Sequence, residues 1–202
     1  MKYKFRDLDP VRTCVSHYKD YRSYKDKLKE DFHGRCAYCN LDSKEITTPF
    51  EIDHFIPNDV FKNEWPELKT TYENLVYSCK KCNRAKGNKF KGEISRRVVV
   101  NELFYDPVKV DYNKIFYRNE KGEICSEDKK GGDMIVLLNL YRPIHSLAWV
   151  CERIKVTIDK LQIQMDSMDK ESLRYKKLKE VKFSLLEIEH DYKSLFIASY
   201  NE

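Results

Sequence analysis

Two pairs of cysteines have the spacing of zinc ligands: Cys36 with Cys39, and Cys79 with Cys82. Each Cys-x-x-Cys pair can place two thiolates on one ion, and four thiolates close the tetrahedral shell of a structural zinc site. Two redox motifs would show the same local spacing. The chain has seven cysteines, and an odd number argues against a disulfide framework. We therefore predict that Zn²⁺ binds these four thiolates and holds the surrounding region together.

An Asp–His pair, Asp53 and His54, lies between the two cysteine pairs. A simple zinc ribbon separates its pairs by about 15–20 residues, whereas here the gap is much longer and contains this pair. An imidazole titrates near neutral pH, so a histidine can take a proton from water. In an extended segment the two side chains would point to opposite faces of the strand. The insertion therefore carries residues that are able to do acid–base chemistry.

The order of the motifs resembles the HNH endonuclease family. The match runs from residue 36 to 88, about a quarter of the chain, and its parts follow one another in a fixed order: Cys36-x-x-Cys39, Asp53-His54-x-x-Pro57, Asn74-Leu75-Val76 and Cys79-x-x-Cys82-Asn83-x-x-Lys86-Gly87. The resemblance implies the ββα-metal fold and hydrolysis of phosphodiester bonds in DNA.

The resemblance also assigns roles to four side chains. It makes His54 the general base and gives Asn74 a place in the catalytic machinery, where it bonds the loop that carries the histidine. It makes Asp53 and Asn83 the ligands of the catalytic metal. Carboxylate and amide oxygens suit Mg²⁺, which retains several waters and binds phosphate oxygens directly. The expected cofactors are thus structural Zn²⁺ and catalytic Mg²⁺ or Mn²⁺.

Basic residues are concentrated after the second strand of this region. Residues 75–97 contain many lysines and arginines but only one acid, Glu93, although the whole chain has a net charge of only +5. A local basic cluster favours a polyanionic partner, and a solvated charged face is the alternative. The candidate nucleic-acid contacts are Lys80, Lys81, Arg84 and Lys86. DNA is the expected substrate, and the residues themselves leave RNA open.

The pattern of apolar and turn residues predicts an α+β chain: a small HNH core with its zinc site, then a β-hairpin, then a helical hairpin. A Lys- and Glu-rich helix is expected from Ser16 to Asp31, ending before Gly34. Strands are expected at 98–100 and in a hairpin over 115–124. Four segments follow: an N-terminal helical extension at 1–31, the nuclease core at 32–97, a β-rich connection at 98–133 and a helical region at 134–202, with a break near 166–169.

The downstream residues resemble the tails of bacterial HNH proteins that occur with ATPase partners in phage defence. The similar parts are Asp106-Pro107, the hairpin, residues 135–143 and Arg153. This resemblance implies a nuclease subunit of an anti-phage system, paired with an ATPase or forming a homo-oligomer through its C-terminal helices. No apolar run reaches the length of a membrane span, so we expect a cytoplasmic protein. The alternatives are a non-catalytic zinc-dependent nucleic-acid-binding module and an adaptor subunit.

Overall fold

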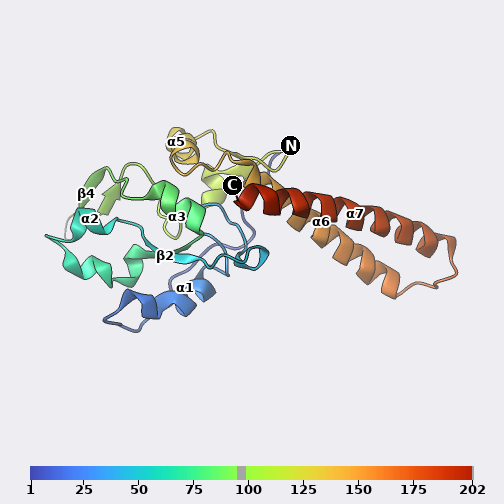
Figure 1. Cartoon of the computed structure of the whole chain (residues 1–202), viewed down its shortest axis with the longest axis horizontal. Coiled ribbons are helices and arrows are strands. Elements are labelled where there is room, and N and C mark those ends of the chain that lie inside the picture. Colours follow the sequence, from blue (N-terminus) through green and yellow to red (C-terminus); the bar gives the residue numbers. More distant parts are fainter. Residues whose placement is uncertain (95–98, 202) are drawn as a thin grey trace. The chain divides into compact units, whose positions relative to one another are not determined.

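The computed structural model describes residues 1–94 and 99–201 (Figure 1). Contacts divide the chain into two units, residues 1–141 and 142–202. The α+β class is confirmed, with small sheets, a cluster of four cysteines and a C-terminal pair of helices. No helix in these ranges is long and apolar enough to cross a bilayer. Arg96 and Arg97 of the basic segment and Val98 of the expected strand lie outside the described residues, and the four-segment division stays a prediction.

The centre of the first unit is a ββα arrangement. Strand β2 (Glu51–His54) pairs antiparallel with β3 (Leu75–Ser78), so that Asp53 lies opposite Val76 and His54 opposite Leu75. All four residues of β3 are buried, as its β-branched and aromatic side chains favour. Helix α3 (Lys80–Lys86) follows directly, and Gly87 ends it with a positive φ of 51°. This arrangement brings the end of β2 next to α3.

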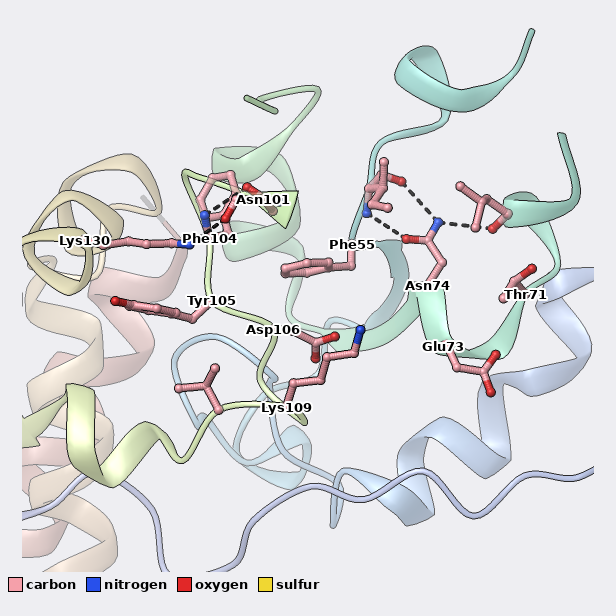
Figure 2. Close-up of a pocket in the computed structure, with 13 residues that line it drawn as sticks. Phe55, Thr71, Glu73, Asn74, Asn101, Phe104, Tyr105, Asp106, Lys109 and Lys130 are labelled. Atoms are coloured by element: carbon pink, nitrogen blue, oxygen red, sulfur yellow. Dashed lines mark hydrogen bonds between the residues drawn. The ribbon is translucent and has the colours of Figure 1, made fainter. Parts of the chain in front are cut away.

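The long connection between β2 and β3 is fixed by Asn74. It contains α2 (Asn58–Phe61) and the 3₁₀ helices η3 (Pro66–Lys69) and η4 (Tyr72–Asn74). The buried Asn74 amide accepts a hydrogen bond from the Ile56 N–H at 2.8 Å and donates to the carbonyls of Ile56 and Leu68 at 3.2 and 3.1 Å (Figure 2). A single side chain therefore joins the residues just after His54 to the far part of the loop.

The N-terminal helix is shorter than expected. It consists of the 3₁₀ turn η1 (Tyr21–Tyr24) and α1 (Lys25–Asp31). Asp20 caps η1 by accepting from the Arg22 N–H, so the helical part begins only there. The preceding stretch is held by Asp31, whose carboxylate accepts from the Thr13 N–H at 2.7 Å and the Thr13 hydroxyl at 2.6 Å. The predicted end before Gly34 is confirmed.

Other short strands surround the ββα centre. Strand β1 (Tyr3–Lys4) pairs with β6 (Tyr117–Arg118), which pairs with β7 (Ile124–Cys125). The predicted hairpin over 115–124 is therefore present, although residue 115 ends a helix. The remaining elements of this unit are η2 (Ser43–Glu45), β4 (Gly92–Ile94) paired with β5 (Val99–Asn101), α4 (Tyr112–Ile115) and α5 (Lys129–Leu137).

The second unit is a pair of long helices, α6 (Pro143–Asp166) and α7 (Leu173–Asn201), which run side by side (Figure 1). The predicted break near 166–169 is confirmed. Ile158 and Met165 of α6 are buried. Several apolar side chains of α7 remain exposed: Val181, Phe183, Leu186, Ile188, Leu195 and Ile197.

Candidate active site and metal centre

The four cysteines of the two pairs come together in the interior. Their sulfur atoms all lie within 4.8 Å of one another, and all four residues are buried. Backbone N–H groups point at two of the sulfurs: that of Cys79 lies 3.4 Å from Cys36 Sγ, and that of Cys82 lies 3.5 Å from Cys79 Sγ. Such bonds stabilise thiolates. Four convergent thiolates suit a closed tetrahedral Zn²⁺ site with no place for a reacting water.

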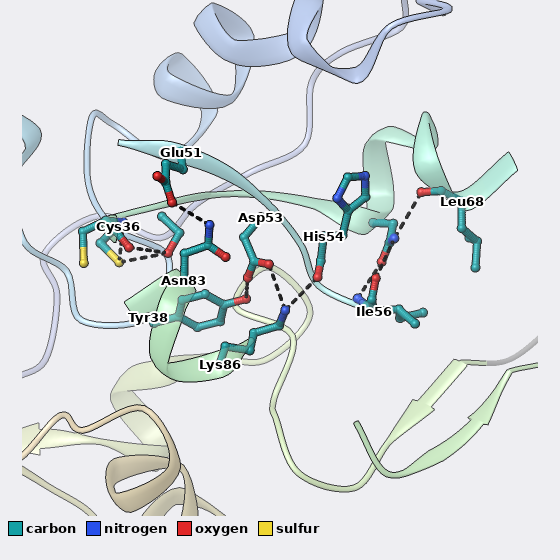
Figure 3. A network of polar contacts seen from close by, with 12 residues as sticks. Cys36, Tyr38, Glu51, Asp53, His54, Ile56, Leu68, Asn83 and Lys86 are labelled. Carbon is teal, nitrogen blue, oxygen red and sulfur yellow. Dashed lines mark hydrogen bonds and ion pairs between the residues drawn. The ribbon is translucent and has the colours of Figure 1, made fainter. Parts of the chain in front are cut away.

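Asp53 is a buried carboxylate with two strong donors (Figure 3). Tyr38 donates its hydroxyl to Oδ2 at 2.6 Å, and the Lys86 ammonium lies 2.8 Å from Oδ1. Burial raises the pKa of Asp53, while the charge of Lys86 opposes that rise. Burial and the neighbouring carboxylate raise the pKa of Tyr38, so the phenol stays protonated and acts as the hydrogen-bond donor. The carboxylate is therefore held in one orientation.

His54 points to the other face of β2, as the alternation of an extended strand requires. Its Nε2 lies 3.0 Å from the carbonyl oxygen of Lys69. The Tyr21 ring meets the imidazole edge-on, with the ring centroids 4.8 Å apart, and Phe61 lies 5.9 Å away. Burial lowers the pKa of His54 below its usual value of 6.5, and the Lys69 carbonyl opposes that change. Burial thus favours the neutral imidazole, which is fixed through one nitrogen.

Asn83 lies between Glu51 and Asp53 (Figure 3). Its amide nitrogen donates to Glu51 Oε2 at 2.7 Å, which leaves its amide oxygen as an acceptor. Tyr38 and Lys86 each donate to a different oxygen of Asp53, and a carboxylate oxygen has two lone pairs. The oxygens of Asp53, Asn83 and Glu51 are the hard ligands that Mg²⁺ prefers, so the donor set fits this ion.

Lys86 does not lie where a phosphate contact was expected. Its side chain has no exposed surface, because it runs from α3 toward the end of β2. There its ammonium also donates to the backbone carbonyl of His54 at 2.7 Å. The expectation that Lys86 binds a phosphate is therefore replaced by a role inside the site. Arg84 is exposed, whereas Lys80 and Lys81 are half-buried; their proposed contacts stay predictions.

The N-terminal segment reaches the site, which the sequence did not indicate. A groove of about 510 Å³ beside Glu51 and Asn83 is also lined by Tyr21, Arg22 and Lys25. Tyr38, the partner of Asp53, lies between the cysteines of the first pair. Its position inside a Cys-x-x-Cys motif is the one signal that could have placed it near the strands.

The comparisons with known proteins match the same part of the chain. Residues 36–89 match the family model of the HNH endonuclease. The chain therefore carries an HNH endonuclease domain. No solved structure matches the chain.

Three curated relatives extend the similarity beyond this domain. The chain is 29% identical to the Septu protein PtuB of Bacillus thuringiensis over 113 residues, which are 56% of this chain and 39% of that protein. It is 30% identical to the Septu protein PtuB of Bacillus mycoides (strain KBAB4) over 145 residues, 62% of this chain and 48% of the relative. It is 26% identical to the Septu protein PtuA of the same strain over 133 residues, 57% of this chain and 18% of the relative. The chain thus spans less than half the length of each relative.

Proposed function

We propose that the chain is a metal-dependent HNH endonuclease that hydrolyses phosphodiester bonds of DNA as the nuclease subunit of a bacterial anti-phage system. The observation that carries the proposal is the anchored His54 imidazole on a strand whose other face holds Asp53, close to Asn83. Nuclease chemistry needs a base for water and oxygen ligands for a cation, and this strand supports both. The similarity to PtuB proteins supports the anti-phage setting.

His54 takes the proton of the attacking water. A carbonyl oxygen only accepts hydrogen bonds, so the nitrogen that faces Lys69 carries the imidazole proton. The other nitrogen, Nδ1, then has a free lone pair that can receive a proton from water. As the water oxygen bonds to phosphorus, its proton moves to Nδ1, and the bond from phosphorus to the leaving oxygen breaks.

Asp53 and Asn83, with Glu51 beside them, would hold the Mg²⁺ ion. When bound, this ion would offset charge on the phosphate oxygens and on the leaving oxygen. Lys86 and Tyr38 orient the Asp53 carboxylate before any cation arrives. Asn74 fixes the loop that follows His54, so its contribution to catalysis is positional.

A plasmid-cleavage assay tests the proposal. The purified chain should convert supercoiled plasmid to the nicked or linear form when Mg²⁺ is added, and should leave it intact in buffer freed of divalent ions. His54→Ala should abolish cleavage while the far-ultraviolet circular dichroism spectrum is unchanged. His17→Ala, which removes an exposed histidine outside the site, is the matched control and should cleave normally. Full cleavage by His54→Ala would refute the assignment.

The alternative function is a zinc-dependent nucleic-acid-binding module without catalysis. It accounts for the cysteine cluster and the basic residues. It gives no role to the oxygen ligands of Glu51, Asp53 and Asn83, or to the anchored His54. The same assay separates the two functions, because a binding module would retard the plasmid in a gel without cutting it in any divalent ion.

The proposal also includes a partner for the C-terminal helices. The exposed apolar side chains on α7, such as Phe183 and Ile197, support a subunit that docks through this helix. An ATPase is the proposed partner, and a second copy of the chain is the alternative. Purification of the tagged chain from its native host should yield an ATPase in equal amount. A chain that purifies alone as a monomer and cleaves DNA at full rate would contradict this part.

A further inference from the structure

The groove beside the proposed metal ligands joins the N-terminal segment to the nuclease core. Tyr21, Arg22 and Lys25 line it from one side, and Glu51, Lys80 and Asn83 line it from the other. The Tyr21 ring also contacts the His54 imidazole at a centroid distance of 4.8 Å. The groove is therefore lined by two of the proposed oxygen ligands, Glu51 and Asn83, and by the tyrosine that contacts the proposed base.

The charged groups of the N-terminal side are available to a ligand. Arg22 and Lys25 are exposed. The Arg22 guanidinium lies 5.1 Å from the Tyr21 ring centroid and 3.6 Å from Asp20, in an exposed ion pair of the kind that contributes little energy. Within residues 1–94 and 99–201, Lys25 and Lys80 have no ion pair. Three cations thus face one groove.

Among the residues that the structure describes, Glu51 is the one acidic side chain that lines the groove, and Asn83 already donates a hydrogen bond to it. A groove with three cations around a single carboxylate attracts an anion, and the carboxylate lies where a cation is expected to bind. Side chains that hold backbone phosphates fix the register of a nucleic-acid strand without reading its sequence.

We propose that Arg22 and Lys25, together with Lys80, bind backbone phosphates that flank the bond to be cut. This inference rests on the proposed nuclease function and adds the N-terminal segment to its substrate-binding surface. The segment then does more than extend the core: it supplies one wall of the groove and places Tyr21 against the catalytic base.

The salt dependence of DNA binding tests the inference. The probe is a fluorescein-labelled DNA duplex, and binding is followed by fluorescence anisotropy in the full chain carrying His54→Ala, without Mg²⁺, so that no cleavage occurs. Each lost phosphate contact makes the slope of log affinity against log salt shallower by about 0.9 on B-DNA. The variant Arg22→Gln/Lys25→Gln should therefore reduce the slope by roughly 1.8.

The matched control is Lys114→Gln/Lys121→Gln, which removes the same charge from exposed positions on other elements. It should keep the parent slope, because neither lysine lines the groove. Equal slopes for the two double variants, or no binding by the parent, would overturn the inference. A chain that binds with the expected slopes but never cuts DNA would refute the proposed function alone, whereas cleavage with equal slopes would refute this inference alone.

Discussion

Replacing Lys86 by Met should destabilise the first unit strongly, because the change leaves a carboxylate buried without its partner. Both side chains of the pair are nearly inaccessible, with exposures of 0% for Lys86 and 7% for Asp53. Removing one member of a buried ion pair costs about 3–5 kcal/mol. Met has a similar length and fills the same volume, so little of this loss would come from a cavity. The bond to the His54 carbonyl is lost as well.

A second variant separates this electrostatic reason from a general packing defect. The variant Lys86→Met/Asp53→Asn has no buried unpaired charge, because the asparagine amide at position 53 is neutral. Contacting residues show interaction energies of about 0.5–3 kcal/mol in double-mutant cycles. The double variant should therefore lose less stability than the sum of the two single variants, by an amount within this range.

The assay is urea unfolding followed by the fluorescence of Trp65, in a Trp149→Phe background so that only the first unit is reported. Lys121→Met, at an exposed turn position, is the matched control. The reasoning fails if Lys86→Met loses no more than the roughly 0.5 kcal/mol of a surface substitution. It also fails if the double variant shows strictly additive losses.

Three further predictions follow from the site. Cys82→Ser should release the bound zinc, measured by atomic emission, and unfold the core, since structural zinc contributes about 10–16 kcal/mol of apparent binding energy; a folded, zinc-loaded variant would contradict the metal centre. Because burial lowers the pKa of His54, kcat/KM should rise with pH through a midpoint below 6.5 and be level at neutral pH. A rise with its midpoint above 6.5 would refute this. Asn74→Ala leaves backbone groups of Ile56 and Leu68 unpaired, so it should cost about 1–3 kcal/mol or more in urea unfolding, and unchanged stability would show that its hydrogen bonds are replaced.

The parts of the structure that local spacing determines were predictable. A Cys-x-x-Cys pair fixes two sulfurs on one turn, and a strand places Asp53 and His54 on opposite faces, so the cysteine cluster and the orientation of these two residues follow from the sequence. The break between the C-terminal helices was also predictable from the sequence, because the apolar repeat stops at residues 166–169. These features depend on contacts within a few residues.

The parts that depend on distant contacts were not predictable. Strand β1 pairs with β6 across more than half of the chain, and neither strand has more than two residues to mark it. Lys86 reads as a surface lysine in a basic helix, because charge alone does not show which face of α3 is turned inward. The groove residue Arg22 likewise lies in a segment whose pattern shows only a helix.

The site is held mainly by polar links, because its two strands are only four residues long. The cysteine cluster joins the segment between β3 and α3, and α3 itself, to the first cysteine pair. Asn74 closes the loop after His54, and Lys86 links α3 to the end of β2. The cysteine cluster fixes elements that neighbour the catalytic strand, and the other two links act at the end of that strand. A short strand offers little apolar area to compensate for a lost link. Changes at these links should therefore reduce stability and turnover together, whereas changes at Arg22 or Lys25 should weaken DNA binding in a fully folded protein. A variant series that sorts in this way would separate the residues that build the active site from those that bring the strand to it.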